Sequence, residues 1–100
     1  MKLTNNQIFG IYNVLTELAN EKLKGSFKFK LFKTIAELEK GVEIVQKTLE
    51  GVGDEEEVAE IAEQTQDLNI ELLTEEELEP LPLSMAQLVV LQVIIDKGDN

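Results

Sequence analysis

The sequence contains no cysteine, histidine, tryptophan or arginine. Without cysteine and histidine, the chain cannot form disulfides, build a zinc site from the usual nitrogen and sulfur ligands, or carry a Ser-His or Cys-His catalytic pair. The patterns GxxxxGK[ST] and GxGxxG are also missing, so no phosphate-binding loop is expected. Carboxylates remain as the reactive groups, and they fall on polar faces. We therefore expect no enzyme and no cofactor.

Long hydrophobic runs are absent too. The longest run, residues 88–91, is far shorter than the roughly 20 apolar residues of a membrane-spanning helix. The N-terminal MKLTNNQ becomes polar after one leucine, unlike a secretory signal peptide. We therefore expect a cytoplasmic protein that does not associate with membranes.

Charge is unevenly distributed along the chain, whose net charge is −11. Residues 1–49 carry eight lysines and five glutamates, whereas residues 50–79 carry thirteen acidic residues and no lysine. The acidic segment would repel phosphate backbones, so direct nucleic-acid binding is not expected. Phe27, Phe29 and Phe32 lie among lysines, a pattern seen in nucleic-acid platforms, but arginine is missing. We interpret these phenylalanines as part of a hydrophobic core.

Hydrophobic spacing predicts a mainly α single domain, residues 1–100, built on an antiparallel helical hairpin with helices at about 4–22 and 26–50. Thr4 and Gln7 form a capping-box pattern at the start of the first helix. Gly25 is expected to adopt the left-handed conformation after that helix. Gly10, inside the first helix, marks either a tolerated surface position or the close approach of another backbone.

A short acidic helix is predicted at about 55–66, followed by an extended strap at 68–83 that contains two prolines. The candidate acidic face of this helix consists of Glu56, Glu57, Glu60 and Glu63. Such a face can gather Ca²⁺ or Mg²⁺, but its spacing matches no Ca²⁺-binding loop, so we interpret it as a solvated surface without a metal. Alternation of Ile70 and Leu72 allows minor β-structure at 69–73.

The C-terminal segment is predicted to be a buried helix at 85–96, although its β-branched residues also allow a strand at 88–95. Its residues are apolar on all sides, and the rest of a chain this short cannot cover every face. The segment is therefore a candidate interface with a protein partner or in a homo-oligomer. The candidate interface residues are Leu88, Val90, Leu91, Ile94 and Ile95.

The opening MKLTNNQIFGIYNVLTEL resembles the start of small, uncharacterised proteins of temperate tailed phages of Gram-positive bacteria. In those proteins a short capped helix precedes a long helix with lysine and phenylalanine, an acidic stretch, and a Pro/Leu-containing segment that ends in a helix. The counterparts here are residues 4–18, 27–49, 50–79 and 81–95. The resemblance implies a phage origin and a location in the host cytoplasm, and it implies no mechanism.

Together these patterns predict a non-enzymatic phage accessory protein that acts through protein–protein contacts or self-association. The alternative is an acidic protein that imitates nucleic acid. The thirteen acidic residues at 50–79 would then occupy the basic groove of a host DNA-binding or defence protein and inhibit it.

Overall fold

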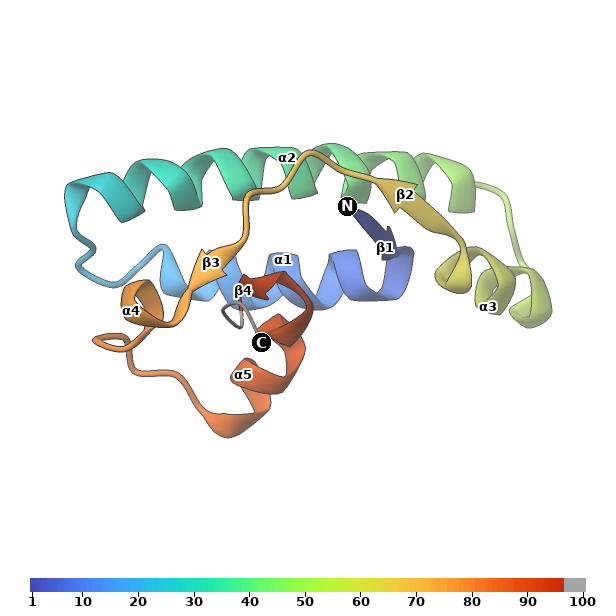
Figure 1. Ribbon diagram of the computed structural model, residues 1–100. Helices are drawn as coiled ribbons and strands as arrows, with labels where there is room; N and C mark the ends of the chain where they lie inside the picture. Colours follow the sequence, from blue (N-terminus) through green and yellow to red (C-terminus); the bar gives the residue numbers. More distant parts are fainter. Residues whose placement is uncertain (97–100) are drawn as a thin grey trace.

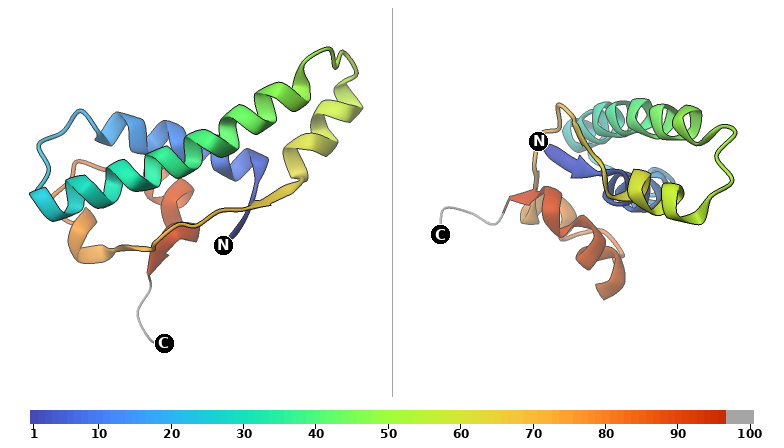
Figure 2. Two further views of the ribbon diagram at one scale, coloured as in Figure 1. Left: turned by 90° about the horizontal axis from the view of Figure 1, so that it is seen from above. Right: turned by 90° about the vertical axis from the view of Figure 1, so that its right-hand side faces the viewer.

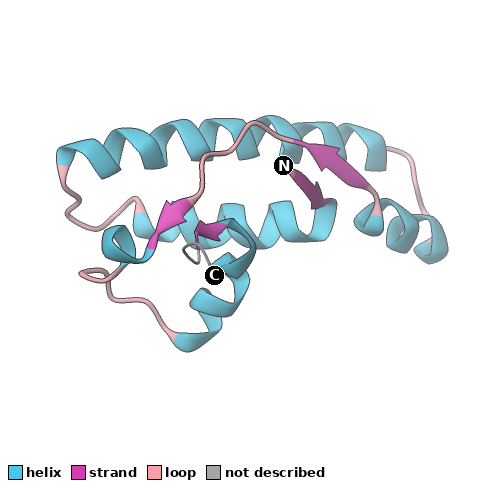
Figure 3. Cartoon of the chain, viewed as in Figure 1, coloured by secondary structure: helices cyan, strands magenta, loops and turns pink. Residues whose placement is uncertain are grey.

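The computed structural model describes residues 1–96, and the fold is mainly helical (Figures 1 and 3). In chain order the elements are β1 (Lys2–Thr4), α1 (Asn5–Leu18), α2 (Gly25–Leu49), α3 (Glu55–Glu63), β2 (Thr65–Asp67), β3 (Leu73–Thr74), α4 (Glu75–Leu78), α5 (Met85–Leu91), the 3₁₀ helix η1 (Gln92–Ile94) and β4 (Ile95–Asp96). The structure confirms the predicted mainly α fold and its helical hairpin. No helix of this part of the chain is long and apolar enough to cross a membrane.

The hairpin of α1 and α2 is antiparallel, and the two helices pack along most of the length of α1 (Figure 1). A capping box starts α1, because Thr4 Oγ1 accepts from the Gln7 backbone N–H at 3.0 Å while Gln7 Oε1 accepts from the Thr4 N–H at 2.8 Å. Apolar residues at spacings of three and four then form the buried seam. Its buried apolar residues are Ile8, Ile11, Val14, Leu15 and Leu18 on α1, and Phe27, Leu31, Leu38, Val42 and Val45 on α2.

Helix α1 is the central layer, with α2 on one side and α5 on the other (Figures 1 and 2). Gly10 lies where α1 meets α5, and a Cβ atom added there would lie 3.4 Å from Cγ1 of Val90. One of the two interpretations placed another backbone close to Gly10. The structure instead places a side chain of α5 there. A separation of this size is ordinary van der Waals contact, so Gly10 is not sterically required.

Short strands join the segment between α3 and α4 to both ends of the described chain. Strand β2 pairs with β1 in an antiparallel ladder that places Leu3 opposite Gln66, and β3 pairs with β4 in a parallel ladder that places Leu73 opposite Ile95. The β-structure predicted at 69–73 coincides with a strand only at Leu73. Strands of two or three residues are too short to show a period in the sequence, and long-range pairing selects them.

A buried polar network fixes β2 and the end of α3 against the hairpin. Asn5, which is 6% exposed, donates from Nδ2 to the Ile61 carbonyl oxygen at 2.6 Å and accepts at Oδ1 from Gln66 Nε2 at 2.8 Å. Gln66 Nε2 also donates to the Gly41 carbonyl oxygen at 3.1 Å. Every buried side-chain nitrogen and oxygen of the described residues has a hydrogen-bond partner, as native interiors require.

Three predicted helix ends are wrong. The first helix ends at Leu18, because Ala19 already takes the capping position. The acidic helix ends at Glu63, because the chain becomes extended at Gln64 to enter β2. The C-terminal helix ends at Leu91, where it tightens into η1 before the pairing of β4 with β3 makes the backbone extended. The segment at 88–95 is therefore helical for most of its length and a strand at Ile95.

Two predictions about the start of α2 also need correction. Gly25 is the first residue of α2, and the glycine with a positive φ among the described residues is Gly51, at 76° after the end of that helix. Phe27 is buried as predicted, but Phe29 and Phe32 are 63% and 67% exposed. The buried face of α2 contains Phe27 and Leu31, and residues two and five positions after Phe27 point away from it.

Candidate functional site

An open groove lined mainly by leucine lies between α4, the loop that follows it and α5. Its volume is about 800 Å³, within the range of small-molecule and peptide-sized sites. The lining residues are Leu78, Leu81, Leu83, Leu88 and Ile95, with Glu75, Glu79 and Gln92 beside them. Apolar surface of this kind in contact with water is costly unless a ligand or partner covers it.

The outer face of α5 continues this apolar area. Met85, Val89 and Val93 are 76%, 57% and 39% exposed, and their spacing of four places them on one side of the helical segment. Leu88, which lines the groove, lies three residues after Met85 and directly before Val89, so it is adjacent to this side of the helix. The groove and the three exposed residues therefore form one continuous area, which we call the C-terminal apolar surface.

The structure places the five predicted interface residues in different environments. Leu88 and Ile95 line the groove, and Val90 is 37% exposed at the contact with α1. Leu91 and Ile94 are completely buried in the core of the same chain, so their prediction as interface residues is wrong. They face α1 because a helix starting at Met85 turns these two positions toward the hairpin.

The exposed residues Met85, Val89 and Val93 were missed in the sequence. The nearest signal in the sequence is the capping box at Ser84, which accepts at Oγ from the Gln87 backbone N–H at 3.1 Å and fixes where α5 begins. Counting helical turns from that cap shows which residues share a side of α5, but which of two apolar sides faces outward depends on how α5 packs against α1.

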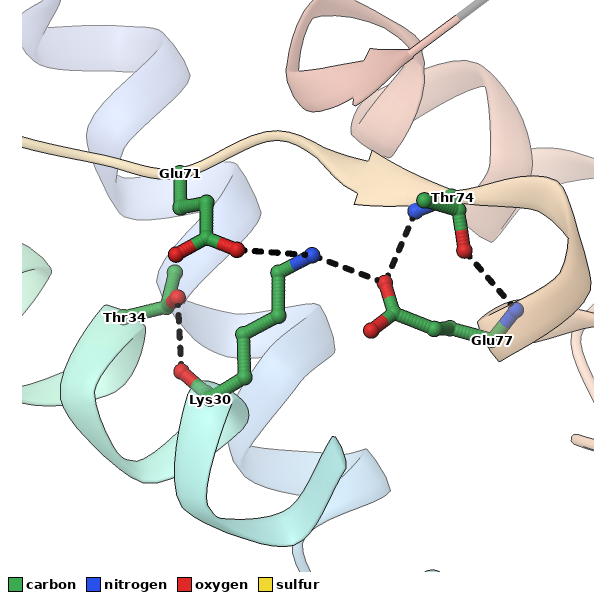
Figure 4. Close-up of polar contacts among 5 residues, drawn as sticks. All are labelled: Lys30, Thr34, Glu71, Thr74 and Glu77. Carbon is green, nitrogen blue, oxygen red and sulfur yellow. Dashed lines mark hydrogen bonds and ion pairs between the residues drawn. The ribbon is translucent and has the colours of Figure 1, made fainter. Parts of the chain in front are cut away.

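Lys30 of α2 holds α4, one wall of the groove, in place (Figure 4). Its Nζ donates to Glu77 Oε1 at 2.9 Å and lies 3.5 Å from Glu71 Oε2, and its side chain is only 13% exposed. Glu77 is also part of the capping box of α4, because its Oε1 accepts from the Thr74 N–H at 2.9 Å. The Glu77 carboxylate thus completes the N-terminal cap of α4 and also attaches α4 to α2.

These contacts shift the ionisation of Glu77. Partial burial acts to raise its pKa, but the hydrogen bond from Lys30, the Thr74 backbone N–H and the Lys30 charge together lower the pKa below its ordinary value of 4.5. Glu77 therefore stays ionised in the folded protein to a lower pH than an isolated glutamate does. The charged form is the one that holds α4 in position.

The predicted acidic face lies at the other end of the molecule. Glu56, Glu57, Glu60 and Glu63 are all exposed on α3, which is remote from α4 (Figures 1 and 2). Within residues 1–96, no three carboxylates are grouped so that they could hold a metal ion. Most acidic residues of 50–79 thus lie in or beside α3 and α4, and the segment 64–74 between these helices contributes Asp67 and Glu71, both in ion pairs.

Comparisons with protein-family models, with curated proteins and with solved structures each returned no match to this chain.

Proposed function

We propose that this protein is a non-enzymatic accessory protein of a temperate phage of Gram-positive bacteria, and that it acts by binding protein through its C-terminal apolar surface. The observation that carries the proposal is the outward apolar side of α5, where Met85 is 76% and Val89 57% exposed, next to the groove of about 800 Å³. Exposed apolar areas of this kind, with polar residues at the rim, mark interaction sites on soluble proteins.

The groove is also supported as a binding site by the way its walls are fixed. One wall is α4, which Lys30 and Glu77 attach to α2, and the other is α5, whose Leu91 is completely buried beneath it. A site on such fixed elements loses little conformational entropy when a partner binds. The lack of cysteine and histidine in the sequence supports a binding role over a catalytic one.

The phage assignment depends on the resemblance of the N-terminal MKLTNNQI pattern. A chromosomal position of the gene within a prophage would support it, and a position among unrelated bacterial genes would contradict it. This test is independent of the binding proposal.

The division of the acidic residues does not favour the alternative function as an imitator of nucleic acid. A DNA duplex presents one negative charge per roughly 1.7 Å in an unbroken array. Here residues 64–74 separate the exposed glutamates of α3 from those of α4 (Figure 1). Within this segment, Glu71 is paired with Lys30 (Figure 4). We therefore do not adopt this function.

The binding proposal is tested with the double variant Met85→Lys/Val89→Lys and the control Ile44→Lys. Ile44 is an apolar residue of α2 that is 56% exposed and lies outside the C-terminal apolar surface. Each protein is measured for self-association by light scattering and for capture of proteins from host lysate. Wild type and control should share at least one association that the double variant loses. Equal behaviour of all three would refute the proposal.

A further inference from the structure

We propose that the C-terminal apolar surface binds a second copy of this chain, through the side of α2 that carries Phe29 and Phe32. This inference rests on the proposed function, because it names the partner of the same surface. It assigns a role to two aromatic residues that the hydrophobic core leaves outside.

The two phenylalanines form the most exposed aromatic area of the described chain. Phe29 and Phe32 are 63% and 67% exposed, and residues three apart on a helix are neighbours on its surface. Lysines surround them: Lys28 and Lys33 are both exposed, and Lys33 Nζ lies 5.2 Å from the centre of the Phe29 ring. We call these four residues the aromatic ridge. Phenylalanine is enriched in the cores of protein interfaces, whereas charged groups such as these lysines belong at the rim.

The groove is complementary to the aromatic ridge in both polarity and charge. Five of its lining residues are leucine or isoleucine, which suits an aromatic ring. Its two charged lining residues, Glu75 and Glu79, are acidic and exposed, and none of the lysines within residues 1–96 lines it. An apolar ridge with lysines would therefore place its rings on the leucines and its ammonium groups near the carboxylates.

The positions of the two surfaces decide the kind of assembly. Helices α2 and α5 lie on opposite sides of α1 (Figures 1 and 2). Phe29 and Phe32 are exposed and do not line the groove of their own chain, so that groove is open to a second copy. Contact between different surfaces of two copies is heterologous, and each copy then still offers one free ridge or one free groove. We therefore expect head-to-tail assembly into a ring or a longer filament.

The test uses complementary variants. The ridge variant is Phe29→Ser/Phe32→Ser, and the groove variant is Glu79→Lys/Leu83→Lys, which places positive charge opposite the lysines of the ridge. Ile44→Ser serves as the control, because it removes another exposed apolar side chain of α2. Circular dichroism checks that each variant is folded. If Leu83→Lys unfolds the chain, Glu79→Lys alone replaces the groove variant, since Glu79 is exposed.

Light scattering across concentration measures the result. The mass of wild type and control should rise with concentration beyond that of a dimer. The ridge variant and the groove variant should each have an association constant lower by at least about tenfold. An equimolar mixture of the two variants should form a one-to-one complex and stop there, because the groove variant still has a ridge and the ridge variant still has a groove.

Three outcomes would overturn the inference. A wild type that stays monomeric at every concentration excludes a second copy as the partner, while surface-dependent capture from lysate would leave the proposed function intact. Association that the groove variant loses and the ridge variant keeps would show a different contact on the second copy. A mixture in which both variants stay monomeric would exclude head-to-tail pairing. If neither association nor capture depends on the surface, the proposed function fails as well.

Discussion

Replacing Asn5 with alanine should strongly destabilise the fold, because Asn5 connects three separate parts of the chain. Its side chain is 6% exposed and bonds to the Ile61 carbonyl oxygen and to Gln66 Nε2. The substitution leaves the carbonyl oxygen without this donor and Gln66 with only its bond to Gly41. A buried polar group that loses its partner costs about 1–3 kcal/mol. The Ile61 carbonyl oxygen keeps its bond from the Gln64 N–H at 3.2 Å, so both groups lose only part of their hydrogen bonding. We therefore expect a loss of about 1–2 kcal/mol in the free energy of unfolding.

The assay is urea unfolding followed by circular dichroism, with thermal unfolding beside it. For a chain of this length, each kcal/mol corresponds to about 4–8 °C in Tm, so the expected decrease in Tm is about 4–16 °C. Asn6→Ala is the matched control, since Asn6 is the same residue type, is next in the helix and is exposed. Its effect should stay within about 0.5 kcal/mol.

A double-mutant cycle tests the reasoning directly. Asn5→Ala and Gln66→Ala remove two ends of the same hydrogen bond, so the loss of stability in the double variant should be smaller than the sum of the single losses by about 0.5–3 kcal/mol. Additive losses, or a loss at Asn5 no larger than that at Asn6, would refute the interpretation of these contacts as one network.

Three further predictions concern α4 and the contact between α1 and α5. The pKa of Glu77 is lowered in the folded state, so the stability that Glu77 contributes is present above the ordinary pKa of 4.5 and is lost as the pH falls through the folded-state pKa. The difference in unfolding free energy between wild type and Glu77→Gln should therefore be constant near neutral pH and shrink below about pH 4.5. A difference that grows on acidification would contradict the assigned cause. Lys30→Met should destabilise the fold by about 1–2 kcal/mol, which is less than the loss of one partner from a fully buried ion pair, because Glu71 is 72% exposed. A double-mutant cycle of Lys30→Met with Glu77→Gln should show positive coupling. Independent effects would mean that the Lys30–Glu77 pair does not hold α4. Gly10→Ala should stabilise by about 0.5–1 kcal/mol, because alanine favours the helix and its Cβ would meet Val90 only at contact distance. Destabilisation in urea unfolding would mean that the added methyl group is too close to Val90 for this reasoning to hold.

Local polar patterns in the sequence were the most reliable guides to the fold. The capping box predicted at Thr4 is present in the structure with both reciprocal hydrogen bonds, and the same residue spacing forms capping boxes at Thr74 and Ser84. Each depends on residues only three apart, so the signal survives whatever the rest of the chain does. The repeat of apolar residues on α2 likewise identified the hairpin, because one continuous helix face meets one partner.

Features that depend on distant partners could not be predicted in this way. Strand β4 exists because Ile95 lies beside Leu73, and nothing within either short segment indicates that pairing. The exposure of Phe29 follows from which side of α2 meets α1, and composition alone favoured burial. For the candidate site, the sequence indicated that the C-terminal segment has too much apolar surface, but separating Leu91 from Val89 required the orientation of α5 in space.

The pairing of β3 with β4 also has a consequence for the time at which the groove exists. Ile95 contributes to the groove and is held there by Leu73, so the groove is incomplete until residues 95–96 have been translated and have left the ribosome. At about 5–20 residues per second, translation from β3 to β4 takes on the order of one to four seconds. During that interval a nascent chain already displays the phenylalanines of α2 but has no finished groove to receive them. Two chains at this stage therefore cannot bind each other through the proposed contact of aromatic ridge and groove.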